Sequence, residues 1–295
     1  MQVDQRILRP ILWSLSLASL LAVLKLVTAW LTHSMAVLAT GLDSSMDIIA
    51  SAMNYILLRY AIVPPDEDHE YGHGKAESMA ALIQGVLIAL SGAYVIGESV
   101  HRLIQGTRID HLASSIYVMI FASVMSTVLV LYLRRKERQH QSLILRSERL
   151  HYSMDILTNF AVVVSLSLVW WTELLIWDLV VSLLIGFYIL QIAYRLLREG
   201  YDELMDRALS EDMRKEIGQI ILNFDPHIKG FHKLRTRKVG KKKFVEFHVV
   251  IHDVKEFRVA HDKTEALIAK VKEHIPDCDV TVHADYEDDS IKEGL

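Results

Sequence analysis

Two aspartates stand in the otherwise apolar stretch "GLDSSMDIIAS", Asp43 and Asp47, and they are four residues apart. The stretch "LHYSMDILTN" repeats the spacing with His151 and Asp155. Residues four apart lie on one face of a helix, about 6 Å apart along its axis. Two such helices facing each other would supply three carboxylates and one imidazole. This donor set predicts a four-coordinate site for zinc or a similar divalent cation.

A bound cation would also explain how these charges are tolerated in an apolar setting. Ionisable residues inside a membrane segment are costly and mark ion or proton pathways. Three carboxylates with a neutral imidazole carry three negative charges, which a divalent cation reduces to one. The empty site would take up protons instead. A single residue of this kind could equally be hydrogen-bonded between helices, but two matched pairs favour metal binding.

A second group of candidate ligands lies in the stretch "PPDEDHEYGHGKAE". It contains the zinc-protease pattern HExxH, whose chemistry requires a helix. Two prolines precede the pattern, one glycine interrupts it and a second follows it directly, so we expect a loop. We interpret Asp66, His69 and His73 as a loop metal site, with Glu70 exposed. A solvated polar loop without metal remains the alternative.

The C-terminal part of the chain is rich in histidine. His232 and His248 fall on two predicted strands, and His261 opens a predicted helix. His283 and Asp285 are two residues apart, so they point to the same side of a third strand. Taken together they favour a site for one or two zinc ions, although each histidine alone would be read as an ordinary surface residue.

The hydropathy of the chain predicts the helices that carry many of these residues. The chain is 52% hydrophobic, with a mean hydropathy of +0.25. A bilayer core needs roughly 20 apolar residues per helix. Six stretches qualify, at 9–31, 36–62, 77–104, 112–134, 144–170 and 177–197. We therefore predict an α-helical membrane protein with six transmembrane helices, in a domain over 1–203.

The remaining residues, 204–295, have the pattern of a small soluble α+β domain. Helical spacing predicts helices over 210–224 and 259–274, and alternation predicts a hairpin over 231–252 and a strand over 278–285. Lysine and arginine are concentrated in the loops on one side of the spans, so we expect both termini in the cytoplasm. The net charge of −4 argues against a nucleic-acid partner. The single cysteine, Cys278, excludes an internal disulfide.

Together with "LMDRAL" and "GFHKLRTRKVGKKKFVEFHV", the motifs quoted above resemble the cation diffusion facilitator family over nearly the whole chain. The resemblance implies a metallochaperone-like cytoplasmic domain and a homodimer. It implies that Asp43, Asp47, His151 and Asp155 form the transport site, that Asp66, His69 and His73 form the loop site, and that His232, His248, His261, His283 and Asp285 form a binuclear site, with His248 bridging. It also implies that Lys75 and Asp206 form a salt bridge near the dimer junction.

The function that follows is proton-coupled antiport of divalent cations out of the cytoplasm by alternating access, in a bacterial inner membrane. Zinc is the expected substrate and also a structural or regulatory ion, and cadmium and ferrous iron are alternatives. Partners would be metal ions, protons, lipid and a second copy of the chain, with no separate cofactor. A membrane-bound metal sensor that moves no ion, and a membrane zinc metalloprotease using "HEYGH", are the other functions considered.

Overall fold

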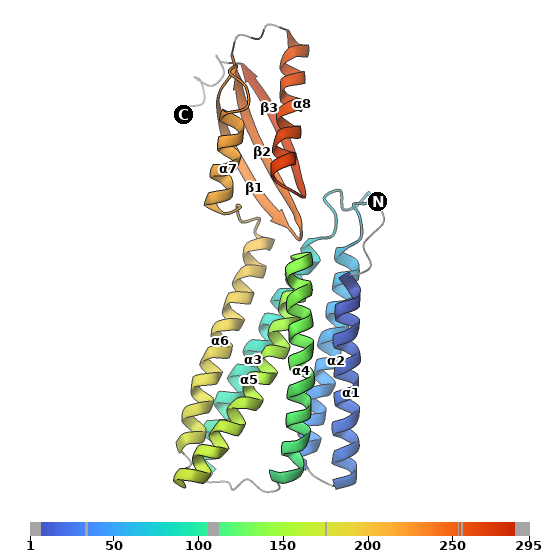
Figure 1. Cartoon of the computed structure of the whole chain (residues 1–295), viewed down its shortest axis with the longest axis vertical. Coiled ribbons are helices and arrows are strands. Elements are labelled where there is room, and N and C mark those ends of the chain that lie inside the picture. The colour runs from blue at the N-terminus through green and yellow to red at the C-terminus, as the bar shows by residue number, and fades with distance from the viewer. Residues whose placement is uncertain are drawn as a thin grey trace. The chain divides into compact units, whose positions relative to one another are not determined.

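The computed structural model describes residues 7–32, 35–105, 112–174, 176–252, 254 and 256–286 of the 295-residue chain. It divides into two compact units, Met1–Tyr201 and Asp202–Leu295 (Figure 1). The predicted domain boundary, between residues 203 and 204, lies close to this division.

The first unit is built of long helices running along a common direction (Figure 1). Within the described residues these are α1 (Leu8–Thr32), α2 (Met35–Ala61), α3 (Lys75–Gln105), α4 (Leu112–His140), α5 (Leu143–Thr172) and α6 (Ile176–Leu204). Each contains most of one predicted span. In the described part of the chain, four are long and apolar enough to cross a membrane: Leu8–Leu31, Lys75–His101, Leu143–Val169 and Ile176–Leu204. That α2 and α4 also cross the membrane stays a prediction.

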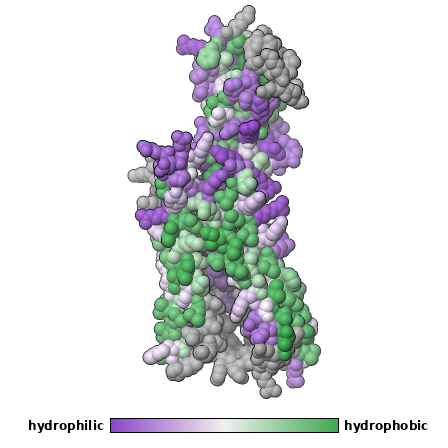
Figure 2. Space-filling model, turned by 180° about the vertical axis from the view of Figure 1, so that it is seen from behind, coloured by the Kyte–Doolittle hydropathy of each residue, from purple (hydrophilic) through white to green (hydrophobic). Residues whose placement is uncertain are grey.

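The surface of this unit is apolar over much of its area. Figure 2 shows hydrophobic side chains covering broad faces of the helices, whereas hydrophilic side chains predominate on the second unit. Trp30 is 74% exposed, Leu184 68% and Phe187 62%. Exposed apolar faces of this extent are stable in lipid rather than in water. The helical unit is therefore membrane-embedded.

The start of α5 is fixed by a carboxylate from another helix. Glu77, in the first turn of α3, is buried. Its Oε2 accepts hydrogen bonds from Ser142 Oγ at 2.8 Å and from the backbone N–H of Leu143 at 2.7 Å. The first N–H groups of a helix have no partner within it, so an external acceptor stabilises them. This contact sets where α5, which carries His151 and Asp155, begins.

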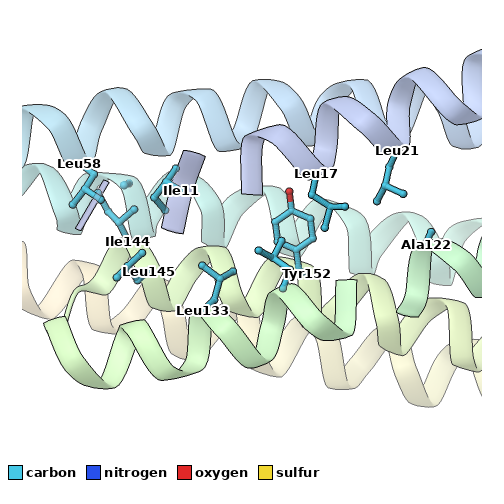
Figure 3. Close-up of a cluster of buried hydrophobic side chains, with 11 residues drawn as sticks. Ile11, Leu17, Leu21, Leu58, Ala122, Leu133, Ile144, Leu145 and Tyr152 are labelled. Carbon is cyan, nitrogen blue, oxygen red and sulfur yellow. The ribbon is translucent and has the colours of Figure 1, made fainter. Parts of the chain in front are cut away.

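The helices of the first unit pack both through large hydrophobic side chains and through glycines. A hydrophobic cluster between α1, α2, α4 and α5 includes the fully buried residues Ile11, Leu58, Leu133 and Ile144 (Figure 3). Helices α3 and α6 instead meet through glycine. A Cβ added at Gly186 would lie 2.4 Å from Ile96 Cγ1 and 3.3 Å from the Gly92 carbonyl oxygen. Only glycine permits so close an approach.

The second unit is an α+β domain, as predicted. It contains α7 (Glu211–Leu222), β1 (Ile228–Val239), β2 (Lys242–Ile251), α8 (Phe257–His274) and β3 (Cys278–Tyr286). The sheet order is β1-β2-β3, with β1 antiparallel and β3 parallel to β2. Its core joins the helices to one face of the sheet through Ile217 and Ile221 of α7, Val245 and Val249 of β2, and Leu267 and Val271 of α8. Gly240, with φ +58°, makes the turn between β1 and β2.

Candidate metal centres

The centre within the helical unit joins α2 and α5. The ligand atoms of Asp47, His151 and Asp155 all lie within 4.8 Å of one another. His151 Nε2 is 3.0 Å from Asp47 Oδ1 and 4.0 Å from Asp155 Oδ2. These side chains are only partly exposed, at 13% for His151, 24% for Asp47 and 39% for Asp155. Asp43 belongs to α2, but its side chain lies outside the described residues.

This α2–α5 centre, with its nitrogen and oxygen donors, can hold either a divalent cation or protons. Deprotonated carboxylates and a neutral imidazole are the forms that ligate zinc. The 3.0 Å contact between His151 and Asp47 is a hydrogen bond through one shared proton. A cation at this position would replace that proton, so metal and proton compete for the same atoms.

In the loop, the three predicted ligands Asp66, His69 and His73 have ligand atoms that also lie within 4.8 Å of one another. Asp66 Oδ1 is 3.2 Å from His69 Nδ1, and Asp66 Oδ2 is 3.2 Å from His73 Nε2. Asp66 Oδ1 also accepts the backbone N–H of His69 at 2.7 Å, which shapes the turn. Desolvation raises the pKa of Asp66, but this backbone bond, the His69 side chain and the charge of His73 outweigh it and lower the pKa.

The geometry of the loop does not suit a zinc protease. Residues 62–74 form turns and bends between α2 and α3. The two histidines of a protease HExxH motif lie on one face of a helix, with the glutamate as base. Here His73 is buried and hydrogen-bonded to the Val63 carbonyl at 3.3 Å, whereas Glu70 is exposed. The protease alternative is not favoured.

The third centre lies across the sheet of the second unit. The strand register aligns His232 of β1 with His248 of β2, and His248 with His283 of β3. Asp285 joins the three imidazoles. Its Oδ2 is 2.8 Å from His232 Nε2 and 2.9 Å from His248 Nδ1, and its Oδ1 is 3.1 Å from His283 Nε2. Desolvation acts to raise the pKa of Asp285, but the hydrogen bond and charge of His248, with His232 and His283, lower it.

Two further predicted residues have other partners in the structure. His261, at the start of α8, is exposed, and its Nδ1 is 3.6 Å from Asp262 Oδ1; among the described residues it is not part of the sheet centre. Asp206 accepts a hydrogen bond from Arg237 at 3.2 Å within the second unit. The pairing of Asp206 with Lys75, a residue of the first unit, stays a prediction.

One buried glutamate near the α2–α5 centre was not predicted. Glu148 is 1% exposed and is held by Ser51 and Asn54 of α2. It precedes His151 by three residues, so it shares that face of α5. Asn54 and Gln84 stand out in the sequence as polar positions in apolar spans. Glu148 does not stand out, because it lies in the charged stretch "RSER" at the edge of its span.

Comparison with known proteins gives consistent matches along the chain. The family model described as "Cation efflux transmembrane domain" matches residues 11–205. The one described as "Cation efflux protein, cytoplasmic domain" matches residues 209–287.

Individual relatives cover nearly the whole chain. The cation-efflux pump FieF of Citrobacter koseri is 36% identical over 271 residues, which is 91% of this chain and 89% of that protein. FieF of Escherichia fergusonii is 36% identical over 272 residues, with 92% and 89% covered. Among solved structures, the metal-bound C-terminal domain of the CzcD transporter from Thermotoga maritima matches with a TM-score of 0.25 and 26% identity, over 26% of this chain and 94% of that one.

Proposed function

The chain belongs to the cation efflux family, and from that membership we propose that it is a proton-coupled antiporter exporting divalent transition-metal cations from the cytoplasm. Membership makes it an integral membrane protein that moves metal cations. Zinc is the proposed substrate, and cadmium and ferrous iron are the alternatives. The membrane is proposed to be a bacterial inner membrane with both termini in the cytoplasm.

The observation that carries the proposal is the convergence of Asp47, His151 and Asp155 between α2 and α5. Compact groups of carboxylate and imidazole inside membrane helices are typical of ion and proton pathways. Asp43, one turn before Asp47 on α2, is proposed as the fourth ligand. Zinc accepts four ligands of this kind in tetrahedral geometry.

The proposed cycle uses the competition between metal and protons at these residues. With the site open to the cytoplasm, the ionised carboxylates and neutral His151 bind the cation. The helices then rearrange, and the site opens to the opposite side. Protons bind there to His151 and the carboxylates and release the cation, because only deprotonated groups ligate it. The protonated site returns, and its protons are lost to the cytoplasm.

The other two centres are proposed to regulate this cycle. Metal at Asp285, His232, His248 and His283 would replace protons that the carboxylate now shares with the imidazoles, and so tighten the sheet. The second unit is proposed to join two copies of the chain as a homodimer, with His261 contributing to a second metal position. The loop centre at Asp66, His69 and His73 is proposed as a further zinc site.

Zinc flux into proteoliposomes under an imposed pH gradient tests the proposal. Wild type would be compared with Asp47→Asn, which keeps the shape of the side chain but removes its charge. Glu70→Gln is the control, because Glu70 is exposed in the loop. We expect gradient-dependent flux in wild type and Glu70→Gln and none in Asp47→Asn. If wild type moves none of zinc, cadmium or ferrous iron, the antiport proposal is wrong and a metal sensor becomes the better hypothesis.

A further inference from the structure

A buried polar cluster outside the three candidate metal centres joins α2, α3 and α5. This carboxylate cluster consists of Glu148, Ser51, Asn54, Gln84 and Tyr152. The side chains of Ser51, Asn54 and Gln84 are 0% exposed, and those of Glu148 and Tyr152 are 1% exposed. Glu148 Oε1 accepts from Ser51 Oγ at 2.5 Å, and its Oε2 accepts from Asn54 Nδ2.

No lysine or arginine among the described residues pairs with Glu148, and the positive charge that acts on it is that of His151, in the metal centre, when the imidazole is protonated. The arginines on either side of it in the sequence are paired elsewhere: Arg146 with Glu199 at 2.6 Å and Arg149 with Glu137 at 2.5 Å. The neighbours that do contact its carboxylate are uncharged. A buried carboxylate without a counter-charge is costly, and such a group commonly binds a proton instead. The packing of this cluster therefore favours the neutral form of Glu148.

The side-chain amides of Asn54 and Gln84 can form hydrogen bonds with either the ionised or the protonated form of Glu148. Asn54 Nδ2 donates to Gln84 Oε1 at 3.3 Å as well as to Glu148. Asn54 Oδ1 and Gln84 Nε2 are buried and have no hydrogen-bond partner in the part of the chain that the structure describes. The two ends of an amide have nearly the same shape, so a half-turn of each exchanges donor and acceptor. Asn54 Oδ1 would then accept from Gln84 Nε2 and from a protonated Glu148. The number of hydrogen bonds at Asn54 is the same in both arrangements.

The charges that face Glu148 belong to the metal centre. On its own helix His151 lies one turn from Glu148 and acts on its charge, and His151 in turn contacts Asp47 of α2 and Asp155. Tyr152 faces Glu148 as well, with its hydroxyl 3.3 Å from Ser51 Oγ and donating to the Ser14 carbonyl of α1 at 3.2 Å. Among the described residues of α3, the uncharged Gln84 is the one hydrogen-bonded to this cluster. A divalent cation at the centre favours ionised Glu148, and its departure favours the protonated form.

We propose that Glu148 is a separate proton-binding site, which releases its proton to water when a divalent cation occupies the α2–α5 centre and binds one when the cation leaves. This proposal rests on the proposed transport function, because the proton at Glu148 would add to those exchanged at the metal ligands. Glu148 does not ligate the metal. The amide pair of Asn54 and Gln84 reverses with the proton.

The number of protons released on zinc binding tests this directly. Isothermal titration calorimetry of the purified full-length protein, in buffers of different ionisation enthalpy, gives that number for wild type, Glu148→Gln and Glu199→Gln. We expect Glu148→Gln to release up to one proton fewer per zinc than wild type. Glu199→Gln, whose carboxylate is half-exposed and paired with Arg146, should match wild type. Equal proton release by wild type and Glu148→Gln would overturn the proposal.

Infrared difference spectroscopy supplies a second measurement that does not need the glutamine variant. Zinc binding should remove a protonated-carboxyl C=O band in wild type, and Glu148→Asp should shift that band. A band that does not shift overturns the proposal. Both measurements follow binding rather than transport. If wild type binds zinc but does not move it across liposomes, the proposed function is wrong, whereas normal transport with unchanged proton release refutes only the role of Glu148.

Discussion

Replacing Glu77 with alanine should destabilise the helical unit, because Glu77 holds the start of α5. Its Oε2 is the acceptor for both Ser142 Oγ and the Leu143 N–H, and the surroundings are buried. A hydrogen bond to a charged group contributes about 1.5–3 kcal/mol, and leaving a buried donor unsatisfied adds to the loss. Since the two bonds share one oxygen they are not fully additive, and we expect a total loss of about 2–4 kcal/mol.

The loss of stability from Glu77→Ala can be measured as a change in melting temperature. For a unit of this size, 1 kcal/mol corresponds to roughly 2–4 °C, so the melting temperature should fall by about 5–15 °C. The assay is thermal unfolding of the purified full-length protein in detergent, followed by tryptophan fluorescence. Glu77→Gln keeps an acceptor without the charge and should lose about half as much.

The matched control for Glu77→Ala is Glu67→Ala, because Glu67 is exposed in the loop between α2 and α3. Its melting temperature should remain that of wild type. A melting temperature for Glu77→Ala within about 1 °C of wild type would refute the reasoning that this carboxylate anchors α5.

Three other predictions concern the remaining parts of the fold. Gly186→Ala should cost about 1–3 kcal/mol in thermal unfolding through overpacking, and the second change Ile96→Ala should recover part of it because Ile96 is the side chain in the way. The hydrogen bond from Lys263 lowers the pKa of Asp225 more than desolvation raises it. The ionised carboxylate therefore stabilises the fold above its unfolded pKa of about 4, and this stability is lost as the pH falls through the folded pKa. Asp225→Asn should flatten the acid dependence of unfolding, as followed by circular dichroism. His248→Ala should reduce the number of zinc ions bound per chain in calorimetry, and an unchanged number would argue against metal at the sheet.

Spacing of ligands along single elements made much of the candidate sites predictable. The interval of four between His151 and Asp155 fixed a shared helix face, and the interval of two between His283 and Asp285 fixed a shared side of β3. Helical and alternating patterns likewise predicted the α+β domain. In each case the geometry of one regular element determines the relation between the residues.

Contacts that depend on packing between elements were harder to predict. Glu148 has the composition of a helix flank, and only the placement of Ser51 and Asn54 opposite it makes it a buried group. Glu77 reads as an ordinary first-turn glutamate, although it serves a different helix. The position of His261 follows from where α8 begins relative to the sheet, a relation that spacing along the chain does not determine.

The glycine contact between α3 and α6 has a mechanical consequence. Where the Gly92 and Gly186 backbones approach each other, the helices are in direct contact, and the Ile96 and Ile189 side chains pack against the two glycines. The contact between α2 and α5 is different, because its hydrogen bonds run between side chains that can exchange partners. In the proposed transport cycle, helices α3 and α6 would therefore move together, and the rearrangement that exposes a bound cation to one side or the other would occur at the contact between α2 and α5.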